Sequence, residues 1–299
     1  MAQKKPNFIV IGAMKAATTS LYTYLKQHPD IFMPKVKEPM FFNNFNQNKD
    51  YKLLGRKGNK ITTLEEYFSL FSDVENESAI GEASPAYIYN ENAPALIKEH
   101  LPDVKIIAIL RQPVERAYSN YLHTKRADRE NTNSFKEAIK IENQRINDNW
   151  SPLYHYIKKG YYSVQLKRYY SIFPKENIKV YLFEDVVKNP KETLKDIFKF
   201  LKVDESFESD TSKKSNVSGT PKGVMGYVLK KMRYYNLMSK FAISDYLPAF
   251  VVNLLFKSVY TKTEKLNSDL RKELTSRFYK EEIKNLEKLI DKDLSSWLS

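Results

Sequence analysis

The chain has 299 residues, of which 42% are hydrophobic and 13% aromatic, a composition that supports a packed core and argues against intrinsic disorder. It contains no cysteine, which excludes a disulfide scaffold, a cysteine nucleophile and a thiolate metal site. The formal net charge is +13, from 49 Lys and Arg against 36 Asp and Glu, which favours polyanionic partners, although a lysine-rich and well-solvated surface explains the charge equally well.

Short apolar runs predict three buried strands, each followed along the chain by a predicted helix. The predicted strands are residues 7–12, 105–110 and 178–182, and the predicted helices are residues 18–27, 113–121 and 193–201. Pro113 suits the first turn of its helix, where its missing N–H costs no hydrogen bond. The stretch 154–170 is also predicted to present a helical apolar face that packs in the core, rather than a nucleic-acid surface.

Strands that alternate with helices predict an α/β fold with a parallel sheet flanked by helices. From residue 264 to residue 298, apolar residues recur at helical spacing and predict one or two C-terminal helices. A single domain over residues 1–299 is the simplest division. Within it, residues 224–260 combine basic and large apolar side chains, which indicates a helical lid over a ligand or an ordinary helical subdomain.

The sequence gives two indications of location. Residues 1–6 are short and basic and lack the apolar core of a secretion signal. No stretch approaches the roughly 20 apolar residues that span a bilayer. We expect a cytoplasmic protein, and peripheral contact of the 224–260 segment with anionic membrane stays open.

The segment from Gly12 to Leu21 lies where a predicted strand passes into a predicted helix. Free N–H groups and the helix dipole make such a point an anion site. Lys15 adds a positive charge and residues 18–20 add three hydroxyl groups. The loop is not a Walker A motif, because Lys15 precedes the hydroxyl cluster by three positions and a second glycine is missing. A polar helix cap would explain the hydroxyls but not Lys15.

The loop Lys15-Ala16-Ala17-Thr18-Thr19-Ser20-Leu21 resembles the 5′-phosphosulfate loop of the sulfotransferases that use 3′-phosphoadenosine 5′-phosphosulfate (PAPS). Further matches follow in order: 37–42 (Lys-Glu-Pro-Met-Phe-Phe), 81–87 (Gly-Glu-Ala-Ser-Pro-Ala-Tyr) and 110–119, which resembles the family's 3′-phosphate motif. The branch is the glycan-modifying and bacterial one. The resemblance implies a P-loop-like fold and PAPS as the sulfuryl donor. We expect no metal requirement, because the loop, Lys15 and Arg111 can supply the positive charge. Ala17 stands where the family usually has glycine, and this could hinder a positive φ.

The second phosphate site is predicted around Arg111, at the end of a buried strand, where ligands of open α/β sheets collect. Its guanidinium can grip phosphate oxygens with two hydrogen bonds. Ser119 follows about two helical turns later and could present its hydroxyl to the same group. Lys222, in a turn-rich segment that resembles the family's late nucleotide loop, is a third candidate contact, with a solvated loop as the alternative.

Sulfuryl transfer needs a general base and stabilisation of the leaving oxygen. The resemblance assigns the base to Glu38, which we expect the neighbouring Phe41 and Phe42 to desolvate in part, and it assigns the leaving oxygen to Lys15. His123 is a fallback base. Relatives often carry histidine where this chain has Met40, and some carry lysine where it has Ala83, so glycan specificity is not carried over freely.

The predicted acceptor is a hydroxyl on a saccharide, a glycolipid or another small molecule. Two other functions stay open. A nucleotide kinase on a related fold would require lysine next to Ser or Thr in the loop, and an aspartate at a strand end. A basic nucleic-acid-binding protein without catalysis would explain the net charge but not the ordered motifs.

Overall fold

The computed structural model describes residues 4–45, 61–212, 219–221, 260–262 and 265–299. The chain divides into two compact units, Met1–Ser215 with Asn267–Ser299, and Asn216–Leu266. In the second unit the described residues form a short antiparallel pair, β6 (Gly219–Pro221) with β7 (Tyr260–Lys262). The predicted lid at 224–260 and the candidate Lys222 lie outside the described residues, apart from residue 260.

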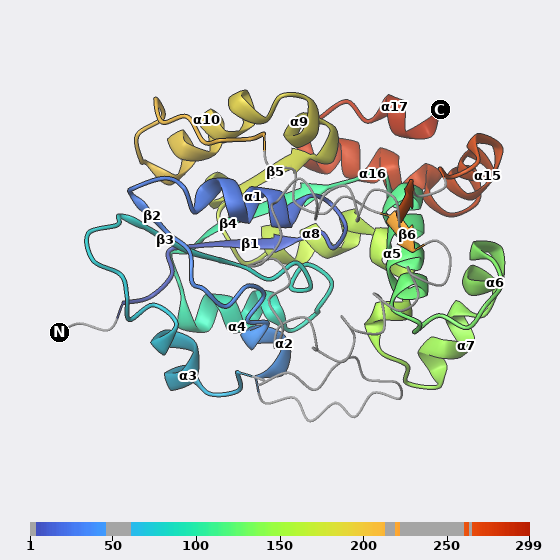
Figure 1. The fold of residues 1–299 in the computed structure, drawn as a ribbon, viewed down its shortest axis with the longest axis horizontal. Helices are drawn as coiled ribbons and strands as arrows, with labels where there is room; N and C mark the ends of the chain where they lie inside the picture. Colours follow the sequence, from blue (N-terminus) through green and yellow to red (C-terminus); the bar gives the residue numbers. More distant parts are fainter. Residues whose placement is uncertain (1–3, 46–60, 213–218, 222–259, 263–264) are drawn as a thin grey trace. The chain divides into compact units, whose positions relative to one another are not determined.

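The first unit is built on a five-stranded parallel sheet (Figure 1). Its order is β2-β3-β1-β4-β5, with β1 in the centre. The strands are β1 (Phe8–Gly12), β2 (Ile31–Phe32), β3 (Ala79–Ala83), β4 (Lys105–Leu110) and β5 (Ile178–Leu182). Phe8 pairs with Gly81 of β3 on one side and Lys105 of β4 on the other. The predicted α/β class and its parallel sheet are therefore confirmed.

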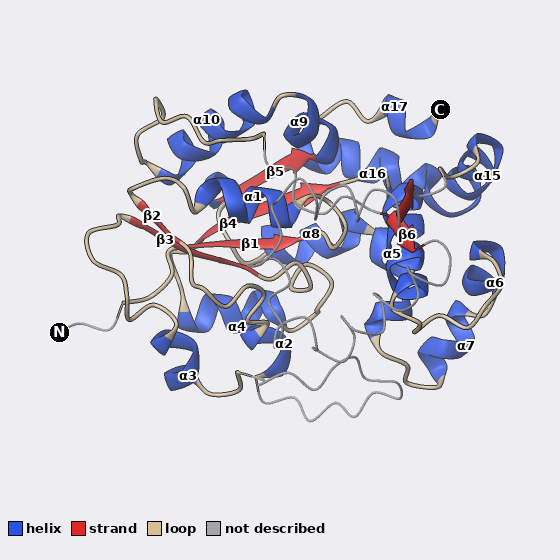
Figure 2. Ribbon diagram, viewed as in Figure 1, coloured by secondary structure: helices blue, strands red, loops and turns tan. Residues whose placement is uncertain are grey.

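Helices cover both faces of this sheet (Figure 2). In Figure 1, α1 and α10 lie on one side, and α3 and α4 on the other. The helices before the second unit are α1 (Thr18–Leu25), α2 (Phe41–Asn44), α3 (Leu64–Ser69), α4 (Ala93–His100), α5 (Pro113–Arg126), α6 (Phe135–Lys140), α7 (Glu142–Asn147), α8 (Tyr162–Tyr170), α9 (Phe183–Lys188) and α10 (Pro190–Leu201). Short 3₁₀ turns stand at Pro152–Tyr154, Lys158–Gly160 and Lys175–Asn177.

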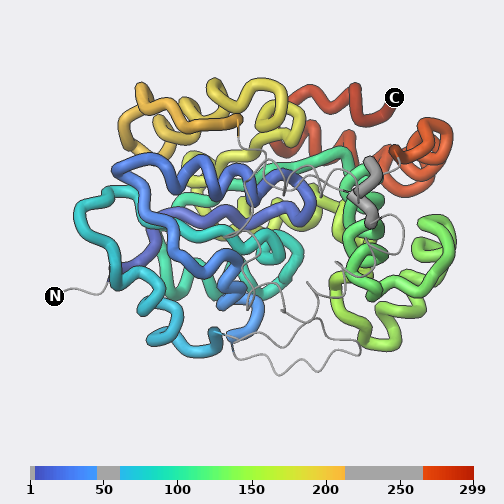
Figure 3. The backbone as a smooth tube through the Cα atoms, viewed as in Figure 1, coloured from blue at the N-terminus to red at the C-terminus, as the bar shows by residue number. Residues whose placement is uncertain are grey.

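The predicted C-terminal helices are confirmed as α15 (Ser268–Leu274), α16 (Lys280–Ile290) and α17 (Ser295–Leu298). A π-helical segment, η4 (Thr275–Tyr279), joins the first two. The chain trace brings this region back to α5 (Figure 3). There, Gln112 donates a hydrogen bond from Nε2 to Thr275 Oγ1 at 2.8 Å, and Trp297 is buried.

The three predicted strands are confirmed, but β2 and β3 were not predicted. β3 escapes because Gly81 and Glu82 interrupt its apolar character, although every residue in it is buried. The predicted helical face over 154–170 is wrong as one helix, since two 3₁₀ turns precede α8 and Val164 is 49% exposed. Core packing of that stretch is confirmed for Ile157, Leu166 and Tyr169.

Candidate active site around the phosphate loop

The phosphate loop runs from the end of β1 at Gly12 to the start of α1 at Thr18. Ala17 occupies the N-cap position with φ 62° and ψ 16°, and no side chain of the described residues caps the helix. The first N–H groups of α1 therefore have no capping acceptor and can bind an anion. Ala17 adopts the positive φ that the family's usual glycine would allow, and as an alanine it bears a steric cost there.

Lys15 is the cation of this loop and also has a left-handed backbone, with φ 71°. Burial lowers the pKa of its ammonium to about 8, and Arg126 is the largest of the neighbouring positive charges that add to the shift. Glu38 acts in the opposite direction. With a pKa near 8, Lys15 remains a cation at neutral pH and is a better proton donor than an ordinary lysine.

Arg111 lies directly after β4 and faces the loop. Its Nη1 is 3.5 Å from the carbonyl oxygen of Lys15, and its guanidinium stacks 4.5 Å from the ring centroid of Phe183. Its Nη2 pairs with Glu115 at 3.3 Å, and Glu115 also pairs with Arg271 at 3.3 Å. These contacts hold the guanidinium beside the phosphate loop, where an anion can replace or join Glu115.

The remaining predicted phosphate contacts lie on two different helices, α1 and α5. Thr18, Thr19 and Ser20 form the first turn of α1, and Thr18 is buried. Ser119 is partly exposed on α5, the helix that begins two residues after Arg111.

Glu38 lies on a tight backbone turn that ends at α2. Both Glu38 (φ 58°) and Met40 (φ 53°) are left-handed, which is uncommon outside glycine and costs of order 1–3 kcal/mol per residue. Phe41 and Phe42 are fully buried, while the Glu38 side chain is 38% exposed. The expected desolvation by these two rings is therefore limited, because they point into the core.

Lys37 joins the predicted base to the predicted phosphate loop, and the sequence reasoning missed it. Its Nζ donates to Thr19 Oγ1 at 2.6 Å and to Glu38 Oε1 at 3.1 Å. Lys37 thus places Glu38 next to the first turn of α1. The available signal was the adjacent Lys-Glu pair in the 37–42 motif.

The end of α5 brings two more basic side chains to Lys15. Burial lowers the pKa of His123 to about 4, and the positive charges of Lys15 and Arg126 lower it further. His123 is therefore neutral at physiological pH and a weak proton acceptor, which leaves Glu38 as the stronger candidate base. Arg126, the last residue of α5, was not among the predicted site residues.

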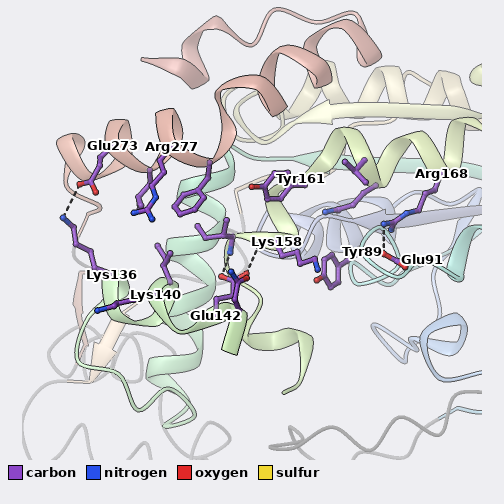
Figure 4. Close-up of a pocket in the computed structure, with 17 residues that line it drawn as sticks. Tyr89, Glu91, Lys136, Lys140, Glu142, Lys158, Tyr161, Arg168, Glu273 and Arg277 are labelled. Atoms are coloured by element: carbon purple, nitrogen blue, oxygen red, sulfur yellow. Dashed lines mark hydrogen bonds and ion pairs between the residues drawn. The ribbon is translucent and has the colours of Figure 1, made fainter. Parts of the chain in front are cut away.

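A hollow of about 820 Å³ lies elsewhere in the first unit, between α6, α7, α8 and the C-terminal helices (Figure 4). Its lining includes Lys140, Lys158, Tyr161 and Arg277, and none of the predicted site residues lines it. Within the part of the chain that the structure describes, no group of three His, Cys, Asp or Glu is placed to hold a metal ion. No described helix is both long and apolar enough to cross a membrane.

Comparison with known proteins agrees with this geometry. The family model described as "Sulfotransferase domain" matches residues 5–246. A solved sulfotransferase structure from Alicyclobacillus acidocaldarius is 32% identical to this chain, with a TM-score of 0.77, and the match covers 99% of this chain and 100% of that one.

Two curated relatives match over shorter parts. The membrane-associated sulfotransferase kil1 of Dictyostelium discoideum is 40% identical over 116 residues, which are 39% of this chain and 22% of that protein. Carbohydrate sulfotransferase 15 of Mus musculus is 26% identical over 251 residues, covering 66% of this chain and 43% of that protein. The chain therefore spans less than half the length of these two relatives.

The left-handed Ala17 can be tested directly. Replacing it with glycine removes a steric cost of about 1–2 kcal/mol and adds unfolded-state entropy worth about 0.4–1 kcal/mol. Ala17→Gly should raise the free energy of unfolding by about 0.5–1 kcal/mol in urea denaturation. The matched control is Ala16→Gly, at a buried position without a positive φ, which should lower it. Destabilisation by Ala17→Gly would contradict the described loop.

Proposed function

The chain belongs to the sulfotransferase family, and we propose that it transfers a sulfuryl group from PAPS to a hydroxyl group of an acceptor. The observation that carries the proposal is a direct hydrogen-bonded link between the predicted phosphate loop and the predicted base. Lys37 bonds both Thr19, in the first turn after the phosphate loop, and Glu38, the candidate base. A donor phosphosulfate at the loop would therefore meet an acceptor hydroxyl at Glu38.

The described residues fit the two charged ends of PAPS. The uncapped start of α1 and the ammonium of Lys15 supply donors and positive charge for the 5′-phosphosulfate. Arg111, stacked on Phe183, supplies a planar guanidinium for the 3′-phosphate. Ser119 lies on the helix that follows Arg111 and is the proposed second contact.

The reaction assigns one task to each catalytic side chain. Glu38 accepts the proton of the acceptor hydroxyl as the acceptor oxygen forms its bond to sulfur. The bond between sulfur and the bridging phosphate oxygen breaks, which leaves 3′-phosphoadenosine 5′-phosphate (PAP). Lys15 stabilises the negative charge that develops on this oxygen and can donate a proton to it. The positive charges at the loop supply the electrostatic stabilisation without a metal.

The acceptor is proposed to be a saccharide, a glycolipid or another small molecule. One relative is named a carbohydrate sulfotransferase, which supports the saccharide. Another is named a membrane-associated sulfotransferase, which keeps contact with anionic membrane within the proposal. We further propose that the reaction takes place in the cytoplasm.

The donor site is tested by calorimetric titration with PAP, using AMP and ATP as controls. Binding should depend on the 3′-phosphate, so PAP should bind at least tenfold more tightly than AMP. Arg111→Ala should remove most of that difference, because it deletes the guanidinium assigned to the 3′-phosphate. Preference for ATP with magnesium would replace the proposal with a nucleotide kinase.

PAP affinity should also depend on pH through Lys15. The pKa of Lys15 in the free protein is lowered to about 8, and a bound anion favours its protonated form. Protonated Lys15 therefore supports binding below pH 8, and above it the Kd should rise by up to about tenfold per pH unit. Lys15→Met should bind more weakly at pH 7 and lose this part of the pH dependence. An unchanged profile in Lys15→Met would remove Lys15 from the donor site.

Glu38→Gln tests the base. The amide is nearly isosteric but cannot accept the proton, so turnover of PAPS should fall by about 10²–10⁴, while PAP binding should stay within about twofold. Turnover can be followed as release of PAP, with water as the acceptor when no other is known. Wild-type turnover in Glu38→Gln would remove Glu38 from the mechanism.

A further inference from the structure

Glu82 is a buried carboxylate with no assigned task. It lies in β3, opposite Ile9 of β1, and is fully buried. Burial raises the pKa of Glu82 to about 7, although the hydrogen bonds that it accepts from hydroxyl groups act to lower it. No lysine or arginine of the described residues bonds to it. A buried acid without a cationic partner is costly, and a hydrophobic side chain is often the more stable choice at such a position.

Three hydroxyl groups hold this carboxylate, those of Ser84, Tyr67 and Tyr87. Ser84 Oγ donates to Glu82 Oε2 at 2.7 Å, and Tyr67 OH donates to Glu82 Oε1 at 3.3 Å. Because Ser84 gives its only proton to Glu82, its oxygen is left to accept. The acceptor role is used by the backbone N–H of Met40, 3.0 Å away. A continuous polar chain therefore runs from Tyr67 through Glu82 and Ser84 to Met40.

This chain ends on the turn that carries the candidate base. Met40 and Glu38 are both left-handed and flank Pro39, a backbone that the surrounding structure must enforce. The same turn is held by ring packing, since Phe41 stacks on Tyr67 with centroids 4.6 Å apart and planes 13° apart. Tyr67 thus contacts both the turn and Glu82.

We propose that Glu82 is a positioning residue for sulfuryl transfer: acting through Ser84, it fixes the turn that aims Glu38 at the acceptor. The inference rests on the proposed role of Glu38 as the base. Lys37 holds the Glu38 side chain from the side of the phosphate loop, and Ser84 holds the backbone of the turn at Met40 from the sheet side. Together these contacts define where the carboxylate stands relative to the phosphate loop.

The chain offers a close control. Ser163 Oγ donates to Glu282 Oε2 at 2.7 Å, and both residues are buried where α8 packs on α16. The Ser163–Glu282 hydrogen bond has the same donor, acceptor and length as the Ser84–Glu82 bond, but it makes no contact with the turn that carries Glu38. Ser84→Ala and Ser163→Ala should therefore lower the free energy of unfolding to a similar extent, and only Ser84→Ala should affect turnover.

Ser84→Ala should lower kcat for PAPS about 10–100-fold, because small misplacements of a catalytic group have effects of this size, with the Kd of PAP within about twofold of wild type. Adding Ser84→Ala to Glu38→Gln should reduce kcat by less than about twofold further, since the base it positions is already lost. Glu82→Leu should behave like Ser84→Ala. Glu82→Gln keeps an acceptor oxygen for Ser84 and should recover most of the activity.

Several outcomes would overturn the assignment. One such outcome is equal turnover in Ser84→Ala and Ser163→Ala. Another is a variant with both Ser84→Ala and Glu38→Gln whose loss of kcat equals the product of the two single losses. Either result would make Glu82 and Ser84 structural residues only and would leave Glu38 as the base. Wild-type turnover in Glu38→Gln would instead overturn the base and its positioning together. If Ser84→Ala does not fold, the comparison of Glu82→Leu with Glu82→Gln decides the question in the same assay.

Discussion

The site depends on positive charge that is concentrated at one point and only partly neutralised. Burial lowers the pKa of the Lys15 ammonium most, and the positive charges of Arg126, Arg111 and Lys37 lower it further. Two like charges about 4 Å apart repel by about 1 kcal/mol in water, and by more where water is excluded. Only a rigid framework keeps such groups together, and a polyanionic ligand relieves the repulsion. A polyanionic ligand therefore supplies the negative charge that the free protein lacks at this point.

The rigid framework is the centre of the parallel sheet. β1 and β4 are almost fully buried, and their ends carry the phosphate loop and Arg111. β3 supports the third segment of the site, the turn that carries Glu38, because Glu82 and Ser84 lie at the end of β3 and hold this turn. The three functional segments thus start at neighbouring strands, which is why residues far apart in sequence share one site.

The sequence predicted the parts of this site whose chemistry is local. A β-branched run followed by a glycine, a lysine and hydroxyls predicts the loop, and an apolar run followed by Arg111 predicts a second phosphate site. β3 could not be recognised, because Glu82 is polar within a strand and one of its hydroxyl partners, Tyr67, lies outside that segment. Lys37 was missed for a similar reason, since its bond to Thr19 joins segments that no periodicity connects. The roles assigned to Lys15, Glu38, Arg111, Ser119 and Lys222 are still predictions.

The position of β1 has a consequence for how the protein folds. β1 is synthesised before the other four strands of the sheet, but its partners are β3 and β4, and Phe8 finds its second neighbour only at Lys105. Pairings this distant in sequence are slow to form, because a long loop must close before any contact stabilises it. The phosphate loop should therefore acquire its shape late, after the ribosome has released β4. Until then the apolar β1 is an exposed strand that can aggregate or engage a chaperone.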